Sequence, residues 1–292
     1  DLPECRKENI LCEPVRRNTA PCIAYAMAKI EKRCEDALVL VMPSDHLIVD
    51  KENFVSRIFQ GFRLARREQV LICLGIKAAY PNTGYGYIQY NMDVCSQDDC
   101  GIKKVKLFTE KPAYEMACSF VESGDFLWNA GIFIWSLQAI KAAFVKFLPE
   151  ITDVILKGRE LLDTDQEEAF VEEAYSICPS ISIDYGIMEK ADNVYVIPSD
   201  FGWSDIGTWG ALYNVMNKDE NGNSVVGKNV MLYDCTNCLI NVPKDRLLVA
   251  QGLDDYIIVE SEGVVMMCKK GEEQRIKQFT TDVEIEKGNE YI

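Results

Sequence analysis

Helix-like and strand-like segments alternate along the first 80 residues of this 292-residue chain. Apolar residues recur at helical spacing in 19–33 and again in 52–67. Each helical segment is followed by a continuous apolar run, 37–42 and 70–76, and such runs are typical of strands that helices cover on both faces. The alternation therefore predicts a layered α/β domain.

The pattern changes near residue 220. Before this point, a long helical stretch over 137–190 accompanies further strand-like segments. After it, short apolar runs are separated by turn residues, and no strict repeat is present. We predict an α/β domain with a mixed middle region over 1–220 and a small all-β domain over 221–292. The further predicted strands before the boundary are 85–90, 105–109, 128–135 and 194–197.

Two aspartates, 160 residues apart, each follow a strand-like run. Asp45 comes after 37–42 in Pro-Ser-Asp-His, and Asp205 comes after 194–197 in Trp-Ser-Asp-Ile-Gly-Thr-Trp. Ligands collect outside the carboxyl ends of strands in open α/β sheets, and Mg²⁺ takes carboxylate and phosphate oxygens. The pair therefore indicates chemistry on a phosphorylated substrate. The alternative is that each aspartate is an ordinary turn or N-cap residue.

Composition excludes several classes of protein. The net charge of −15 argues against a nucleic-acid surface, because such domains are usually basic. No run of eighteen apolar residues is present, so no membrane helix is predicted, and the first residues have no signal-peptide pattern. Cys235 and Cys238 form a lone C-x-x-C, which favours a strand turn over a zinc site. We expect a cytoplasmic protein.

Other polar segments could bind a ligand, although each also has a simple structural explanation. The loop from Glu13 to Pro21 leads into a helix, whose free N–H groups and nearby arginines suit a polar ring or a phosphate. A capped helix with solvated arginines would look the same. The glycines of Asn82–Tyr87 would let a ligand approach the backbone, but a hairpin turn explains them equally well.

Two short segments complete this set. Glu110 and Lys111 end a strand-like run, where they could bind sugar hydroxyls and a phosphate or form a surface ion pair. Asn129 and Gly131, in Trp-Asn-Ala-Gly, place an amide and a flexible backbone at the start of another strand.

Taken in order, these motifs resemble those of the mannose-1-phosphate guanylyltransferases, a family of sugar-phosphate nucleotidyltransferases. The resemblance runs from Glu13 to Trp209. It rests on Glu-Pro-x-x-Arg-Asn-Thr-Ala-Pro, Pro-Ser-Asp-His, Thr-Gly-Tyr-Gly-Tyr-Ile, Glu-Lys-Pro, Trp-Asn-x-Gly-x-Phe, Ser-Ile-Asp-Tyr-x-x-Met-Glu-Lys and Trp-Ser-Asp-Ile-Gly-Thr-Trp. It implies a layered Rossmann-like nucleotidyltransferase domain with a mixed sheet, followed by a small β-helix-like domain. The implied reaction makes GDP-mannose and pyrophosphate from GTP and mannose 1-phosphate.

The resemblance also implies roles for individual residues. Asp45 and Asp205 would bind Mg²⁺ or Mn²⁺, and they would form the catalytic set together with Lys111, which would contact the sugar phosphate. His46 would have a supporting role, because a phosphate dianion needs no general base. Asp184 and Lys190 could take part, or could be a helix cap and a surface lysine. The nucleotide would contact Glu13, Asn18, Thr19 and Pro21, and the sugar would contact Gly86, Glu110, Asn129 and Gly131.

The sequence lacks one motif of the family, the N-terminal glycine-rich loop, and this changes the expected activity. Members begin with a glycine-rich loop, Gly-Gly-x-Gly-x-Arg-x-Trp-Pro, followed by a lysine that contacts the phosphates, and this sequence has neither. About 60–80 residues, roughly two β-α-β stretches, would precede Asp1 in a family member. We expect a protein that truly starts at Asp1 to be inactive. We also expect no C-terminal isomerase domain of the kind that some members carry.

Alternatives remain open from the sequence. The chain could be a non-catalytic nucleotide-sugar-binding or regulatory subunit on the same fold, or a nucleotidyltransferase for another sugar phosphate. We expect a homodimer, because the small β-rich domain implied by the resemblance often pairs subunits.

Overall fold

The computed structural model describes residues 6–96 and 99–291, and the chain divides into two compact units. Unit 1 comprises the chain up to Ser44 and Ile48–Trp203. Unit 2 comprises Asp45–Leu47 and the chain from Ser204 onward. The short strands β2 (Leu47–Ile48) and β8 (Trp203–Ser204) pair with each other where the chain passes between the units.

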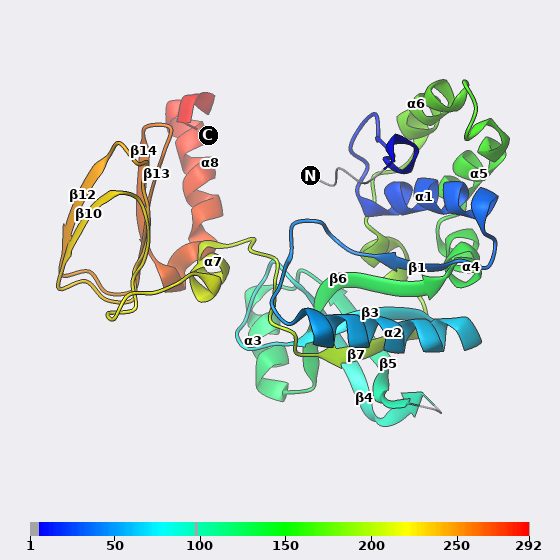
Figure 1. Ribbon diagram of the computed structural model, residues 1–292, viewed down its shortest axis with the longest axis horizontal. Coiled ribbons are helices and arrows are strands. Elements are labelled where there is room, and N and C mark those ends of the chain that lie inside the picture. The colour runs from blue at the N-terminus through cyan, green and yellow to red at the C-terminus, as the bar shows by residue number, and fades with distance from the viewer. Residues whose placement is uncertain (1–5, 97–98, 292) are drawn as a thin grey trace. The chain divides into compact units, whose positions relative to one another are not determined.

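Unit 1 is built on a six-stranded mixed sheet (Figure 1). The central pair, β3 and β7, is parallel, whereas the other pairings are antiparallel. The last strand in the order, β4, also pairs with β6. A mixed sheet was predicted, and the structure confirms it. The strand order is β1 (Leu38–Val41), β6 (Phe126–Ser136), β3 (Leu71–Lys77), β7 (Val194–Ser199), β5 (Asp99–Glu110) and β4 (Gly86–Ser96).

Helices cover both faces of this sheet, which explains the continuous apolar runs. Along β3, Leu71 and Cys73 pack in one core cluster, whereas Ile72 and Leu74 pack in the other. Each fully buried leucine or isoleucine contributes about 1.5–3 kcal/mol of transfer free energy. Helix α2 (Lys51–Arg67) contributes buried residues to the second core cluster. Its N-cap residue, Asp50, accepts from the Asn53 backbone N–H at 3.0 Å.

The first core cluster is formed mainly by helices on the opposite face. They are α1 (Thr19–Arg33), α4 (Leu137–Phe147), α5 (Pro149–Lys157) and α6 (Glu167–Ile177), followed by the π-helical turn η3 (Asp184–Met188). These elements confirm the predicted succession of helices over 137–190. The helix α3 (Tyr114–Ser123) packs with Tyr87 and Trp128 in a third cluster. Single 3-10 turns occur at η1 (Lys7–Asn9) and η2 (Arg159–Leu161).

Unit 2 contains short parallel strands that stack in register. Leu239 of β11 pairs with Ser224 of β9 on one side and with Ile257 of β13 on the other. A second, two-stranded sheet forms from β10 and β12. Buried Ile240 and Ile258 pack with Val230 and Leu248, so they fill the core that the two sheets share. The strands are β9 (Ser224–Val226), β10 (Asn229–Tyr233), β11 (Leu239–Asn241), β12 (Leu247–Gln251), β13 (Tyr256–Ser261) and β14 (Val264–Lys269).

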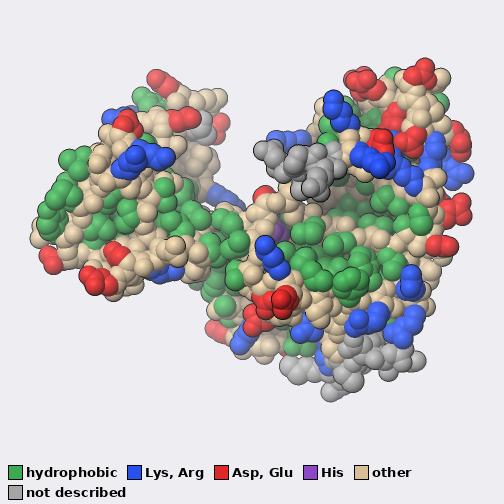
Figure 2. Space-filling model, viewed as in Figure 1, with side chains coloured by type: hydrophobic (Ala, Val, Ile, Leu, Met, Phe, Trp, Pro, Cys, Tyr) green, Lys and Arg blue, Asp and Glu red, His purple; other side chains and the backbone are tan. Residues whose placement is uncertain are grey.

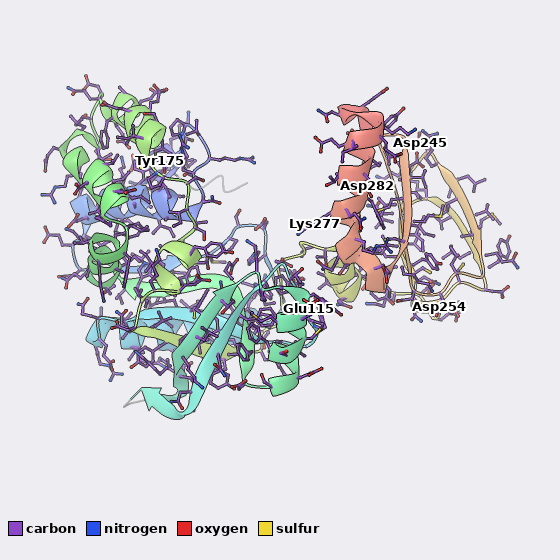
Figure 3. The ribbon with its side chains drawn as sticks, turned by 180° about the vertical axis from the view of Figure 1, so that it is seen from behind. Glu115, Tyr175, Asp245, Asp254, Lys277 and Asp282 are labelled. Carbon is purple, nitrogen blue, oxygen red and sulfur yellow. The ribbon has the colours of Figure 1, made fainter. Side chains whose placement is uncertain are left out.

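The C-terminal region is β-rich, as predicted, but it ends in a helix that the sequence did not predict. Helix α8 (Ile276–Lys287) places Ile276 and Phe279 against the sheet of β11, β13 and β14. Lys277 and Asp282, labelled in Figure 3, are exposed. Few apolar residues mark the buried side of α8, so its helical period is weak. The other elements of unit 2 are α7 (Trp209–Val215), η4 (Lys270–Arg275) and η5 (Asn289–Tyr291).

Two sequence expectations can be compared directly with the structure. Cys235 and Cys238 are buried free thiols, and they donate to the carbonyl oxygens of Tyr233 and Thr236. This agrees with the strand-turn interpretation of the C-x-x-C. Within the described ranges, we find no helix with the length and hydrophobicity needed to cross a membrane.

Candidate functional site

The residues predicted to contact the sugar converge from the start of β4, the end of β5 and the interior of β6, and we call this group the Glu110 cluster. It comprises Gly86, Glu110, Asn129 and Gly131, together with Asp184. Gly86 pairs with Glu110 across β4 and β5. A Cβ on Gly86 would lie 2.3 Å from Glu110 Oε2 and 3.1 Å from Asn129 Cβ. Glycine is therefore required for this close approach.

The Asn129 side chain is buried and held in one orientation. Its Nδ2 donates to Asp184 Oδ1 at 2.9 Å, and its Oδ1 accepts from the Gly131 backbone N–H at 3.0 Å. A backbone N–H can only donate and an ionised carboxylate can only accept. These two neighbours therefore fix which end of the amide points where, and one Nδ2 hydrogen remains for a ligand.

The Glu110 carboxyl group is dry but not fully partnered. Its side chain is 10% exposed, and Oε1 lies 3.1 Å from Lys111 Nζ. Glu110 Oε2 is buried and has no hydrogen-bond partner among the described residues. Burial and the nearby Asp184 raise the pKa of Glu110, whereas Lys111 opposes this rise. A buried acceptor without a donor is costly, which makes Oε2 a candidate for binding a ligand hydroxyl.

Lys111 follows in a strained turn. Its φ of 48° lies in the left-handed region, where non-glycine residues are uncommon and often functional. Its backbone N–H donates to the Tyr85 carbonyl at 3.1 Å, while its side chain remains 59% exposed. The turn therefore holds the lysine backbone in place and leaves the ammonium group accessible to an anion.

The turn η3 supports this cluster through residues that the sequence did not single out. Glu189 accepts from the Glu110 backbone N–H at 2.9 Å, and the Tyr185 hydroxyl donates to the Glu110 carbonyl at 3.3 Å. Both residues belong to the Ser-Ile-Asp-Tyr-x-x-Met-Glu-Lys motif, which was the available signal. π-helical turns are rare and frequently lie at functional sites. Lys190, from the same motif, is exposed.

The residues predicted to contact the nucleotide lie on the loop before α1 and in the first turn of that helix. Asn18 has φ 61° and donates from Nδ2 to Ser180 Oγ at 2.9 Å. Thr19 Oγ1 accepts from the Ile183 backbone N–H at 2.8 Å. Glu13, Asn18 and Thr19 are exposed, whereas Pro21 is buried in the first turn of α1. The segment 180–189 therefore contacts this loop at one end and the Glu110 cluster at the other.

Arg17 braces the same loop from the side. Its Nε donates to the carbonyl oxygen of Tyr175 at 3.0 Å, near the C-terminal end of α6, where Figure 3 labels this tyrosine. A second bond runs from Arg17 to the Ser176 carbonyl at 3.2 Å. The arginine thus helps to fix the loop backbone, a role that the sequence did not distinguish from solvation.

Asp45 and Asp205, which we call the aspartate pair, both belong to unit 2. Asp45 is exposed and Asp205 is partly buried. Burial lowers the pKa of His46, and both carboxylates oppose that shift, so both lie near the imidazole. Asp205 Oδ1 also accepts from the Gly207 backbone N–H at 3.0 Å. The sequence could not show that these two aspartates share one neighbour.

The donor set of the aspartate pair fits a hard divalent cation. Two carboxylates completed by substrate phosphates and water are a common Mg²⁺ environment. No group of three or more His, Cys, Asp or Glu side chains suited to a metal ion is found in the described ranges.

The comparisons with known proteins agree on the class. A family model for nucleotidyl transferases matches residues 3–222. An alginate biosynthesis protein AlgA from Pseudomonas putida is 34% identical over 93% of this chain and 55% of its own length. A mannose-1-phosphate guanylyltransferase from Salmonella montevideo is 34% identical over 97% of this chain and 60% of its own length.

A solved structure supports the same assignment. The crystal structure described as a mannose-1-phosphate geranyltransferase from Thermus thermophilus matches with a TM-score of 0.77 at 28% identity, covering 94% of this chain and 77% of that one. The predicted fold class is thereby confirmed. The chain spans little more than half the length of the two curated relatives. Because the family model covers most of the sequence, the chain belongs to the nucleotidyl transferase family.

Proposed function

We propose that this protein transfers a guanylyl group from GTP to mannose 1-phosphate, giving GDP-mannose and pyrophosphate. The observation that carries the proposal is the buried Glu110 Oε2, which has no hydrogen-bond partner among the described residues. It lies beside an oriented Asn129 amide, with the exposed Lys111 ammonium next to them. An acceptor, a donor and a cation side by side suit a hexose 1-phosphate. The Salmonella montevideo relative, a mannose-1-phosphate guanylyltransferase, supports mannose as the sugar and guanine as the base.

The reaction requires no protein nucleophile. An oxygen of the sugar phosphate attacks the α-phosphorus of GTP, the new P–O bond forms, and the bond to pyrophosphate breaks. Lys111 would hold the attacking phosphate, while Glu110, Asn129, Gly86 and Gly131 would hold the sugar. Orientation and charge neutralisation account for most of the rate in such a transfer.

Three further assignments belong to this proposal. Asp45 and Asp205 would hold Mg²⁺ or Mn²⁺, which when bound neutralises phosphate charge. Glu13, Asn18, Thr19 and Pro21 would contact the nucleotide. We also propose a cytoplasmic homodimer. Hydrophobic side chains gather on unit 2 (Figure 2). The exposed apolar residues on its outer strands β10 and β12, namely Met231, Tyr233, Leu247 and Val249, support pairing there.

The proposal is tested in the complete protein by measuring the pyrophosphate released from each of GTP, ATP, UTP and dTTP in the presence of mannose 1-phosphate. We expect turnover with GTP to exceed the others by on the order of 10²-fold or more, because guanine-specific hydrogen bonds discriminate strongly. Omission of the divalent cation should abolish turnover. Equal rates with UTP or dTTP would overturn the guanine assignment, and activity with another hexose 1-phosphate in preference to mannose 1-phosphate would overturn the sugar.

A further inference from the structure

We propose that Asp184 is a positioning residue for sugar recognition: it fixes the orientation of the Asn129 amide, and this orientation makes the Glu110 cluster select a hexose 1-phosphate. The inference rests on the proposed function and extends it to a residue whose role the sequence left open between a ligand contact and a helix cap. The contacts of η3 decide between these alternatives.

The helix-cap alternative does not account for the Asp184 side chain. Its Oδ1 accepts from Asn129 Nδ2 on β6, 55 residues earlier in the chain. Burial is the largest cause that raises the pKa of Asp184, and the Asn129 hydrogen bond and Lys111 act against this rise. A helix-capping role alone would require only bonds to backbone N–H groups at the start of the same helix, and no bond to a strand. This carboxyl group instead accepts from an amide on a strand, in addition to its own backbone N–H, in a largely buried site.

The orientation of that amide determines what a sugar meets. In the observed orientation, Asn129 offers one Nδ2 hydrogen, and Glu110 offers the unpartnered acceptor Oε2. One donor beside one acceptor can bind a hydroxyl that both accepts and donates, or two neighbouring hydroxyls. The reversed amide would leave the Gly131 N–H without an acceptor and place Oδ1 against the Asp184 carboxyl. Both changes are unfavourable.

The same turn also holds the second member of the pair. Glu189 and Tyr185 contact the backbone N–H and carbonyl of Glu110, while Asp184 contacts Asn129. Three residues of one short segment therefore fix both the acceptor and the donor. Loss of Asp184 releases only the donor, so it should impair sugar binding selectively and leave the nucleotide loop unaffected.

The test compares Asp184→Ala with Asp184→Asn in the complete protein. Asp184→Ala should raise both the KM and the calorimetric Kd for mannose 1-phosphate by on the order of 10- to 100-fold, because the freed amide no longer offers its donor. The KM for GTP should change by less than about twofold. Asp184→Asn retains an acceptor oxygen and should restore most of the sugar affinity. A purely structural residue would alter both KM values together and would show no such rescue.

Two controls keep the result interpretable. Asp125→Ala removes another carboxylate–amide bond, Gln89 Nε2 to Asp125 Oδ2 at 2.7 Å, and should leave the sugar KM unchanged. The single variant Asn129→Ala and the double variant Asn129→Ala/Asp184→Ala should bind the sugar equally weakly. In both, no amide remains to be oriented. This comparison holds even if Asp184→Ala alone fails to fold.

The outcomes separate this inference from the proposed function. If the wild-type protein binds no hexose 1-phosphate, the proposed function fails and the inference fails with it. If the wild type binds mannose 1-phosphate and Asp184→Ala binds it equally well, the inference alone is overturned. A further loss of sugar binding when Asp184→Ala is added to Asn129→Ala would also overturn it, because Asp184 would then act independently of the amide.

Discussion

The carboxylates of the Glu110 cluster and those of the aspartate pair are held in opposite ways. Glu110 is almost fully buried, Asp184 is directed at one amide, and burial raises the pKa of both. Asp45, in contrast, is exposed, and Asp205 is only partly buried and closes a local turn through the Gly207 N–H. One set is dry and held by long-range contacts, whereas the other is wetter and held by its own loop.

This difference matches what each set would bind. A neutral hydroxyl is recognised by a donor and an acceptor in fixed positions, and a dry site strengthens those bonds. A divalent cation is held most strongly by ionised carboxylates, and two carboxylates buried together without a cation would instead tend to share a proton. Partial exposure therefore suits the aspartate pair, and burial suits the Glu110 cluster. Substitutions at the aspartate pair and at the Glu110 cluster test the two halves of this comparison, and the pH dependence of stability tests the burial of the Glu110 cluster.

The largest expected effect is at the aspartate pair. Asp205→Asn should lower kcat on the order of 10²–10³-fold, because a metal-bridging carboxylate contributes several kcal/mol to the transition state. The melting temperature should change little, because an amide oxygen can still accept from the Gly207 N–H. Steady-state kinetics at saturating divalent cation measures the effect.

Lys190→Ala serves as the matched control for that substitution. Lys190 is exposed, belongs to a motif shared with the family and should contribute little to turnover. Comparable losses in the two variants would show that Asp205 does not bind the metal. Partial recovery of Asp205→Asn at higher Mn²⁺ concentration would sharpen the assignment, since a weakened site is filled by mass action.

An intermediate effect is expected at the Glu110 cluster. Gly86→Ala places a Cβ within 2.3 Å of Glu110 Oε2, so the carboxyl group must move. We expect the KM for mannose 1-phosphate to rise on the order of 10-fold or more, with overpacking costs of about 1–3 kcal/mol. The KM for GTP should be nearly unchanged. The measurement is initial rates with each substrate varied in turn.

Gly84→Ala is the control, since it lies in the same turn and its new Cβ would meet only Asn82 Oδ1, at 3.2 Å. Its effect on the sugar KM should be less than about threefold. If the two alanine variants behaved alike, the turn and not the approach to Glu110 would set the affinity. A change confined to the GTP KM would place the sugar elsewhere.

The sequence predicted the layers of the α/β unit better than it predicted the contacts within the Glu110 cluster. The alternation of apolar runs predicted the layered α/β unit, because both faces of β3 are covered. The family motifs named Glu110 and Asn129, and the structure brings them together. Spacing could not reveal that Asp184 contacts Asn129 or that Glu189 and Tyr185 hold Glu110, because these contacts depend on how η3 packs against β5 and β6.

The C-terminal region shows the same limit. Its short strands were visible as apolar runs between turn residues, whereas α8 was not. The contacts of α8 with the core come from Ile276 and Phe279, and its other side is charged and solvated. A helix that buries so narrow a stripe is specified by the sheet on which it packs, and sequence periodicity alone carries little of that information.

The smallest expected effect concerns the burial of Asp184 and its dependence on pH. Burial raises the pKa of Asp184 in the folded protein, helped by Glu189 and opposed by Asn129 and Lys111. Between the unfolded and the folded pKa, the folded state therefore keeps a proton that the unfolded chain has already lost, and stability falls as pH rises through this interval. Asp184→Asn removes this loss. Its stability relative to wild type should increase from pH 4 toward pH 7 in urea unfolding, a pH range that begins near the ordinary aspartate pKa of about 3.9.

Asp163→Asn should change stability with pH in the opposite direction to Asp184→Asn. The hydrogen bond from Lys29 holds the pKa of Asp163 below its ordinary value, so its contribution to stability is present at neutral pH and is lost on acidification. Relative to wild type, that variant should therefore be destabilised throughout the range above about pH 4, and the difference should shrink as the pH falls below this value. Neighbouring Glu110 moves in the same direction as Asp184, so Glu110→Gln should reproduce the Asp184→Asn trend. If the stability difference from wild type did not change between pH 4 and pH 7 for Asp184→Asn and Glu110→Gln, the Glu110 cluster would be hydrated. The contrast with the aspartate pair would then rest on geometry alone.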